Sequence, residues 1–192
     1  MLSATTTLRQ VALLLFVAAL TSVVQNRATL ADDGSPKIMQ SSDLIVVRIP
    51  KSNTFAAYSK HTGEWTRHTF DKDSTIAPVA GASVCAFSVK GKATSELAAV
   101  DHNGRWHIQK LSAATSSLCS PIVSSHIAVF TVDRHSYAFS ATKGKWDSIS
   151  AVGAVVASDV AILVDSTQVA AFSAECPYWS VLKTSTDTRK KK

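Results

Sequence analysis

The chain has 192 residues, of which 46% are hydrophobic and 18% charged, and its formal net charge is +6. That surplus comes from Arg9 and Arg27 near the start and from residues 189–192 (RKKK) at the end, while the segment between carries balanced charge. The high isoelectric point is therefore an effect of the ends, and it excludes a strongly basic, nucleic-acid-binding core. We expect residues 185–192 to form a solvated, disordered basic tail. Weak attachment to an anionic polymer is the alternative.

Residues 1–31 are typical of a secretory signal peptide. Residues 1–10 are polar, and Val11–Val24 is an almost wholly apolar run. This run is shorter than the roughly 20 residues that a membrane-spanning helix needs, but it suits a signal core. Small residues follow, so we expect cleavage after Ala31, a linker over 32–35 and export to a periplasm or the exterior. The alternative is an uncleaved N-terminal anchor; after cleavage we expect no membrane span.

Four tryptophans mark an internal repeat in the remainder: Trp65, Trp106, Trp146 and Trp179. Each ends a similar phrase, FAAYSKHTGEW, LAAVDHNGRW, YAFSATKGKW and VAAFSAECPYW. Glycine stands two positions before the first three tryptophans, at Gly63, Gly104 and Gly144, and Pro177 replaces it in the fourth copy. The repeats are predicted over 36–74, 75–117, 118–151 and 152–184. A repeat of this length indicates a solenoid or a propeller.

A second phrase precedes the first in every copy and ends in Asp43-Leu44, Ser83-Val84, His126-Ile127 and Asp159-Val160. Each copy then predicts four short strands. They are a small-residue segment, an apolar run such as Leu44–Ile49, an alternating strand such as Phe55–Ser59, and a strand that starts at the tryptophan. Gly63 and its equivalents are expected to take positive φ in tight turns between the third and fourth strands.

One four-stranded sheet of about 35–40 residues cannot bury both of its faces, so successive sheets must stack. We therefore predict an all-β fold, a small β-propeller of four blades with three to four antiparallel strands each. The tryptophans are expected to wedge between adjacent blades. Whether four blades close within one chain stays open, and an incomplete ring would make a homodimer possible.

The phrases SYAFSATKGKWDSI and TFAAYSKHTGEWTRHTF resemble the strand–turn–Trp half of kelch-type propeller blades and are similar to quinoprotein-type blades. This resemblance covers residues 36–184, and it implies an architecture but no activity. The paired glycines of kelch blades are missing, since Val132-Asp133-Arg134 stands in their place. The tryptophan follows the turn glycine more closely than in quinoprotein blades, so the resemblance implies no cofactor.

Two repeat positions carry the candidate binding residues. Asp43, Ser83, His126 and Asp159 lie between the first two strands, where equivalent side chains converge near the axis and could hold a cation, water or a small polar ligand. The alternative is that they only stabilise turns. His61 and His102 fall in turns that we expect at the periphery, too far apart to share a metal, so no metal site is predicted.

The sequence contains no nucleophile-elbow, zinc-protease, P-loop or dinucleotide motif, and we assign no catalytic residue. Of the three cysteines, Cys85 and Cys119 lie in apolar, strand-like context and are expected to be small buried residues. Cys176 completes an odd number, so at most one internal disulfide can form. The leading hypothesis is an exported, non-enzymatic module that binds a protein or a surface polysaccharide. The alternative is a small polysaccharide hydrolase or lyase with its site at the central mouth.

Overall fold

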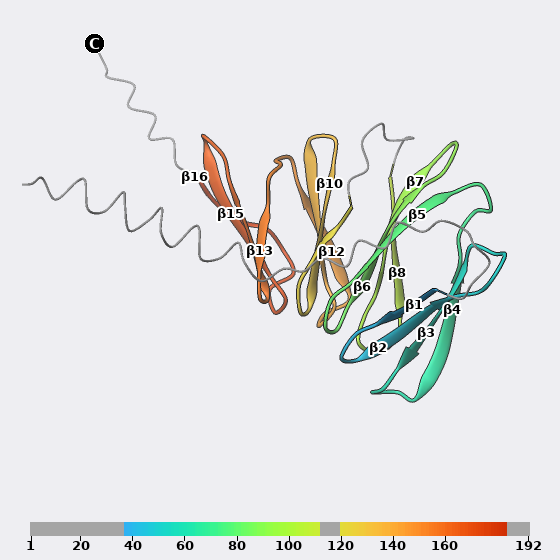
Figure 1. The fold of residues 1–192 in the computed structure, drawn as a ribbon. Coiled ribbons are helices and arrows are strands. Elements are labelled where there is room, and N and C mark those ends of the chain that lie inside the picture. The colour runs from blue at the N-terminus through green and yellow to red at the C-terminus, as the bar shows by residue number, and fades with distance from the viewer. Residues whose placement is uncertain (1–36, 112–119, 184–192) are drawn as a thin grey trace, which may run out of the picture.

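A computed structural model describes residues 37–111 and 120–183, which fold into four separate four-stranded antiparallel sheets (Figure 1). The all-β, four-bladed prediction is confirmed. The predicted signal peptide, linker, basic tail and Cys119 lie outside the described residues. Among the residues that the structure describes, no helix is long and apolar enough to cross a membrane.

Each sheet is a simple meander, in which strands that follow one another in sequence are hydrogen-bonded neighbours. Blade 1 contains β1 (Lys37–Gln40), β2 (Leu44–Arg48), β3 (Thr54–Ser59) and β4 (Glu64–Thr69). Blade 2 contains β5 (Thr75–Ala80), β6 (Cys85–Lys90), β7 (Ser95–Val100) and β8 (Trp106–Lys110). Blade 3 contains β9 (Ile122–Val123), β10 (Ile127–Val132), β11 (His135–Ser140) and β12 (Lys145–Ile149). Blade 4 contains β13 (Val155–Ala157), β14 (Val160–Val164), β15 (Gln168–Ser173) and β16 (Ser180–Lys183).

The turn before the tryptophan is built as expected. Gly63, Gly104 and Gly144 have φ of 70°, 78° and 62°, in the left-handed region that glycine reaches without steric cost. In blades 1 and 3 the glycine amide donates to the carbonyl four residues earlier, as in Gly144 N to Ser140 O at 2.8 Å. The turn of blade 2 is one residue shorter. Its tryptophan therefore pairs with Val100, six positions earlier, rather than with Ala99, seven positions earlier as in blades 1 and 3.

Three apolar clusters hold the blades together, one at each junction between successive blades. Phe55 and Phe87 meet between blades 1 and 2 with ring centroids 5.2 Å apart. Phe130 and Phe139 are buried between blades 2 and 3, and Phe172 between blades 3 and 4. Since each blade hides an apolar face against its neighbour, burial of these faces is the main stabilising term of the fold.

The tryptophans show a direction in this stacking. Trp106, Trp146 and Trp179 belong to the clusters that their own blades form with the preceding blade. We call the side of a blade that carries its tryptophan the rear face, and the opposite side, which meets the next blade, the forward face. The predicted wedging of tryptophan between blades is thus confirmed for blades 2, 3 and 4.

The four blades form an open row, with blade 1 and blade 4 at opposite ends (Figure 1). None of the three clusters of the described residues joins blade 4 to blade 1. Trp65 on the rear face of blade 1 is consequently 56% exposed, whereas Trp179 is only 9% exposed. The rear face of blade 1 and the forward face of blade 4 are therefore the two unpartnered faces of the fold.

Candidate functional site

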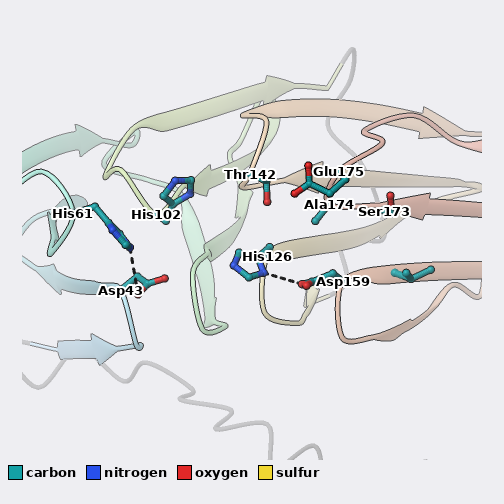
Figure 2. Close-up of a pocket in the computed structure, with 10 residues that line it drawn as sticks. Asp43, His61, His102, His126, Thr142, Asp159, Ser173, Ala174 and Glu175 are labelled. Carbon is teal, nitrogen blue, oxygen red and sulfur yellow. Dashed lines mark hydrogen bonds and ion pairs between the residues drawn. The ribbon is translucent and has the colours of Figure 1, made fainter.

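A group of polar side chains lies at one end of the sheets. In a meander, the turn between strands one and two and the turn between strands three and four lie at the same end. Both turns of the blades line a pocket of about 520 Å³, with side chains in two rows (Figure 2). Its lining residues are Asp43, His61, His102, His126, Thr142, Asp159, Val160, Ser173, Ala174 and Glu175.

The first row comes from the turns between strands one and two, which are linked from blade to blade. The Asp43 amide donates to the Ala82 carbonyl of blade 2 at 3.2 Å, and the Ser83 amide donates to the Ser125 carbonyl of blade 3 at 2.8 Å. The Ser124 hydroxyl of blade 3 donates to the Ser158 carbonyl of blade 4. The first turns therefore follow one another in a continuous, hydrogen-bonded line across all four blades.

Along this line the four predicted residues interact as two pairs. The Ser83 hydroxyl donates to an Asp43 carboxylate oxygen, and Ser83 is buried and does not line the pocket. His126 Nδ1 lies 2.8 Å from Asp159 Oδ1, and both side chains are partly exposed. The residues thus support neighbouring turns, as the structural alternative requires, while Asp43, His126 and Asp159 remain accessible from the pocket. Ligand binding by this row stays a prediction.

The electrostatics of Asp43 fix its charge. Hydrogen bonds from Lys60 and Ser83, with a further contact from His61 at 3.4 Å, lower the pKa of Asp43 to about 2. Burial acts in the opposite direction but is outweighed. At neutral pH Asp43 is therefore a carboxylate that accepts hydrogen bonds and neither gives nor takes a proton in a reaction.

The second row contains His61, His102, Thr142 and Glu175, which share the repeat position before the tryptophan. We expected the two histidines to be far apart, and that expectation is wrong. Their ring centroids are 5.4 Å apart in an edge-to-face arrangement. The error came from considering only the distance from the axis, since turns of adjacent blades at equal radius still lie side by side when the blades stack closely.

His102 contributes an unused hydrogen-bonding atom. The Asn103 side-chain nitrogen lies 3.1 Å from His102 Nε2. Nδ1 is buried and has no hydrogen-bond partner within residues 37–111 and 120–183. A buried polar atom without a partner is costly, and Ser95 Oγ, Trp146 Nε1 and Trp179 Nε1 are in the same state outside the pocket.

The groups do not combine into a metal site. Within the described ranges, no set of three or more histidine, cysteine, aspartate or glutamate side chains is placed to hold a metal ion. Each carboxylate of the pocket instead has a basic neighbour: Lys60 for Asp43, His126 for Asp159, and Lys143 at 2.7 Å for Glu175. Each carboxylate that lines the pocket thus has a basic partner.

Neither of the described cysteines lines the pocket. Cys85 is buried as expected, and burial raises the pKa of its thiol, so that it stays protonated and unreactive. Cys176 is exposed near the pocket rim, in the turn before Trp179. Neither forms a disulfide in the structure.

No family model matches the chain, and no curated protein is similar to it in sequence. Solved structures give loose overlays: HIRA(644–1017) has a TM-score of 0.41 at 8% identity, over 86% of this chain and 58% of that one. The N-terminal domain of Nup159 has a TM-score of 0.33 at 11% identity, over 77% and 47%. Hsv2 from Kluyveromyces lactis has a TM-score of 0.28 at 14% identity, over 78% and 64%.

All three are β-propeller proteins, and this chain spans less than two thirds of the length of each. The class is defined by the chain's own strand pairing: it is an all-β protein of four propeller-type blades.

Proposed function

We propose that this protein is a non-enzymatic binding module and that the pocket between the two rows of turns binds a neutral, hydroxyl-rich polymer such as a surface polysaccharide. The observation that carries the proposal is the arrangement in Figure 2, in which turns from all four blades line one site and its three carboxylates each have a basic partner. Blade repetition extends such a site along the row, which suits a linear partner with repeated polar groups.

The charge pairing supports a neutral ligand. Because Asp43, Asp159 and Glu175 each have a basic partner, a strongly charged ligand would compete with existing pairs and gain little Coulomb energy. A hydroxyl group can donate to the carboxylate and accept from an N–H of its basic partner.

The fixed charge of Asp43 favours binding over catalysis, since a general acid or base needs a pKa near the working pH. A second candidate function is nevertheless favoured by one observation. The His126–Asp159 pair, at 2.8 Å and open to the pocket, has the geometry of an imidazole base oriented by a carboxylate. A polysaccharide hydrolase or lyase would use this pair.

Titration of neutral polysaccharides against the purified protein, with calorimetry for binding and reducing-end release for turnover, tests the proposal. We expect binding without turnover, and at least about tenfold weaker binding for His126→Ala and Asp159→Asn, each of which removes one partner of a polar pair. Lys92→Ala is the control, since Lys92 pairs with Asp73 on the surface outside the pocket. Turnover that Asp159→Asn abolishes would establish the enzyme instead.

A complete lack of polysaccharide binding, together with retention of a protein partner that the same variants release, would assign the pocket to protein recognition. That result would contradict the proposal in its ligand class but keep the site. Loss of binding in Lys92→Ala alone would place the site elsewhere.

We further propose that the protein acts after export. The support is the apolar run Val11–Val24 followed by small residues up to Ala31. Intact mass measurement of the protein secreted by cells that express the full chain should give a product that starts at Asp32. An intracellular product that retains residues 1–31 would contradict export.

A further inference from the structure

The exposed large apolar side chains are concentrated at the two ends of the row. On the rear face of blade 1 they are Ile38, Ile45 and Trp65. On the forward face of blade 4 they are Val155, Val160, Ile162, Val164 and Leu182. Blades 2 and 3, which have a neighbour on each side, carry no member of this set on their strands among the described residues.

Strand pairing places each of these sets on one face. Ile45, Tyr58 and Trp65 are paired directly across β2, β3 and β4, so they share the rear face of blade 1. The rings of Tyr58 and Trp65 are 5.3 Å apart and lie on this open face. Val155 and Ile162 are paired across β13 and β14 on the forward face of blade 4.

The same positions are closed inside the row. Ile162 of blade 4 corresponds to Val46, Ala86 and Val129 in blades 1, 2 and 3, which are all buried against the following blade, whereas Ile162 is 47% exposed. These are faces that the fold normally buries, and they differ from the solvated outer face of an edge sheet.

Polar contacts of the internal junctions also have their counterparts at the two ends. At the junction of blades 1 and 2, the Thr66 hydroxyl accepts from Trp106 Nε1 at 3.2 Å and donates to the Gly104 carbonyl. Ser180 holds the place of Thr66 in blade 4 and is exposed, and Trp65 holds the place of Trp106 in blade 1.

A second contact repeats in the same way. The Ser59 hydroxyl of blade 1 donates to the His102 carbonyl of blade 2, and the Ser140 hydroxyl of blade 3 donates to the Ala174 carbonyl of blade 4. Ser173 occupies this position in blade 4 and has no following blade within the described residues. The forward face of blade 4 thus carries both the apolar surface and the hydroxyl donors of an internal junction.

We propose that the forward face of blade 4 in one copy packs against the rear face of blade 1 in a second copy and repeats the internal blade junction between chains. Two copies that make this junction twice, related by a twofold axis, bury all four open faces and leave no end. The smallest closed assembly is therefore a dimer of eight blades. A head-to-tail junction of this kind is self-limiting when the ring closes.

The internal junction of blades 1 and 2 gives the position of a cross-link. Met39 Sδ and Cys85 Sγ lie 4.0 Å apart across it. The equivalent positions at the open ends are Val155 in blade 4 and Ile45 in blade 1, both exposed. A disulfide between cysteines placed at these two positions would report the proposed junction directly.

The test uses the full chain with Ile45→Cys and Val155→Cys, in a background of Cys119→Ser and Cys176→Ser, treated with oxidised glutathione. We expect a disulfide-linked dimer on a non-reducing gel. When the two single variants are mixed, only dimers with one chain of each variant can be linked, so we expect at most about half of the dimers to be cross-linked. A disulfide within one chain would show that the four blades close on themselves and overturn the proposal. Absence of any cross-link at high protein concentration would overturn it as well.

Light scattering over a concentration series gives an independent readout. Ile162→Lys should raise the dimer dissociation constant at least about tenfold, because a charge would be buried in the junction. Val152→Lys is the matched control, since Val152 is also 47% exposed but lies in the segment between blades 3 and 4. A wild-type chain that stays monomeric at every concentration, or equal effects of the two variants, would refute the dimer.

Discussion

The interior of the row and its two ends are made from the same repeat, yet they expose very different surfaces. Blades 2 and 3 bury both faces, whereas blade 1 and blade 4 each leave one face open. Residues of the same type can therefore be compared between a face that has a neighbouring blade and a face that has none. The comparison teaches that burial in this protein depends on the adjacent blade more than on the residue itself.

The tryptophan pair should show the largest difference. Trp179→Ala removes an indole packed against blade 3, and we expect it to lower the free energy of unfolding by about 3–5 kcal/mol. Trp65→Ala, at the open end, should cost about 1 kcal/mol in the monomer, since little burial is lost. Urea unfolding at dilute protein concentration measures both. Equal losses would mean that Trp65 has a partner within the chain.

The isoleucine pair compares two forward faces at positions two residues apart in the repeat, since Ile162 corresponds to Val129. Ile127 of blade 3 is 0% exposed, and Ile127→Ala should reduce stability by about 2–5 kcal/mol. Ile162→Ala on the open forward face of blade 4 should reduce it by less than about 1 kcal/mol in the monomer. In concentrated solution, where the dimer forms, the loss of stability caused by Ile162→Ala should increase. A large effect of Ile162→Ala at every dilution would contradict the open end.

The glycine pair separates backbone strain from crowding. Both Gly63 and Gly144 have positive φ, so an alanine at either costs about 1–2 kcal/mol. A Cβ at Gly144 would also lie 2.7 Å from His107 Cε1 of blade 2, whereas one at Gly63 meets nothing within 4 Å. We expect Gly144→Ala to lower the thermal midpoint further than Gly63→Ala. The reverse order would show that a neighbour covers the Gly63 turn.

The smallest effect concerns charge at the pocket. The pKa of Asp43 is about 2 in the folded protein against 3.8 unfolded, so its contribution to stability is present above pH 3.8 and is lost as the pH falls towards 2. Asp43→Asn should reduce stability by about 1 kcal/mol at pH 7, allowing for solvent screening, and the difference should vanish near pH 2. A constant difference across this range would show that the lowered pKa is not its cause.

Much of the fold could be predicted because the same turn and packing residues recur in each copy of the repeat. The four tryptophans and three glycines fixed the turns and placed most strand ends within a residue or two, as for Thr54–Ser59 and Trp106–Lys110. The blade 2 turn was harder, because Asp101 there accepts from the Asn103 and Arg105 amides and from His107 in a turn that is one residue shorter than in blades 1 and 3.

The pocket was predicted only in part. The row of Asp43, His126 and Asp159 could be predicted because its position recurs in register. The second row was not predicted, because His61 and His102 were expected at the periphery. Strand parity places both turns at one end, and that signal was available in the sequence. The sequence contains no signal for whether the blades close into a ring, because repetition specifies the junction between neighbouring blades but not how many blades complete the ring.

The most direct test of the open row is the distance between its end faces. Spin labels at Arg67→Cys on the rear face of blade 1 and Ser180→Cys on the forward face of blade 4, diluted into unlabelled protein, report distances within single chains. Three sheet spacings separate the labels, so we predict a distance of about 30 Å or more. A distance near one spacing, about 10 Å, would show that blades 1 and 4 meet within one chain and would contradict the account.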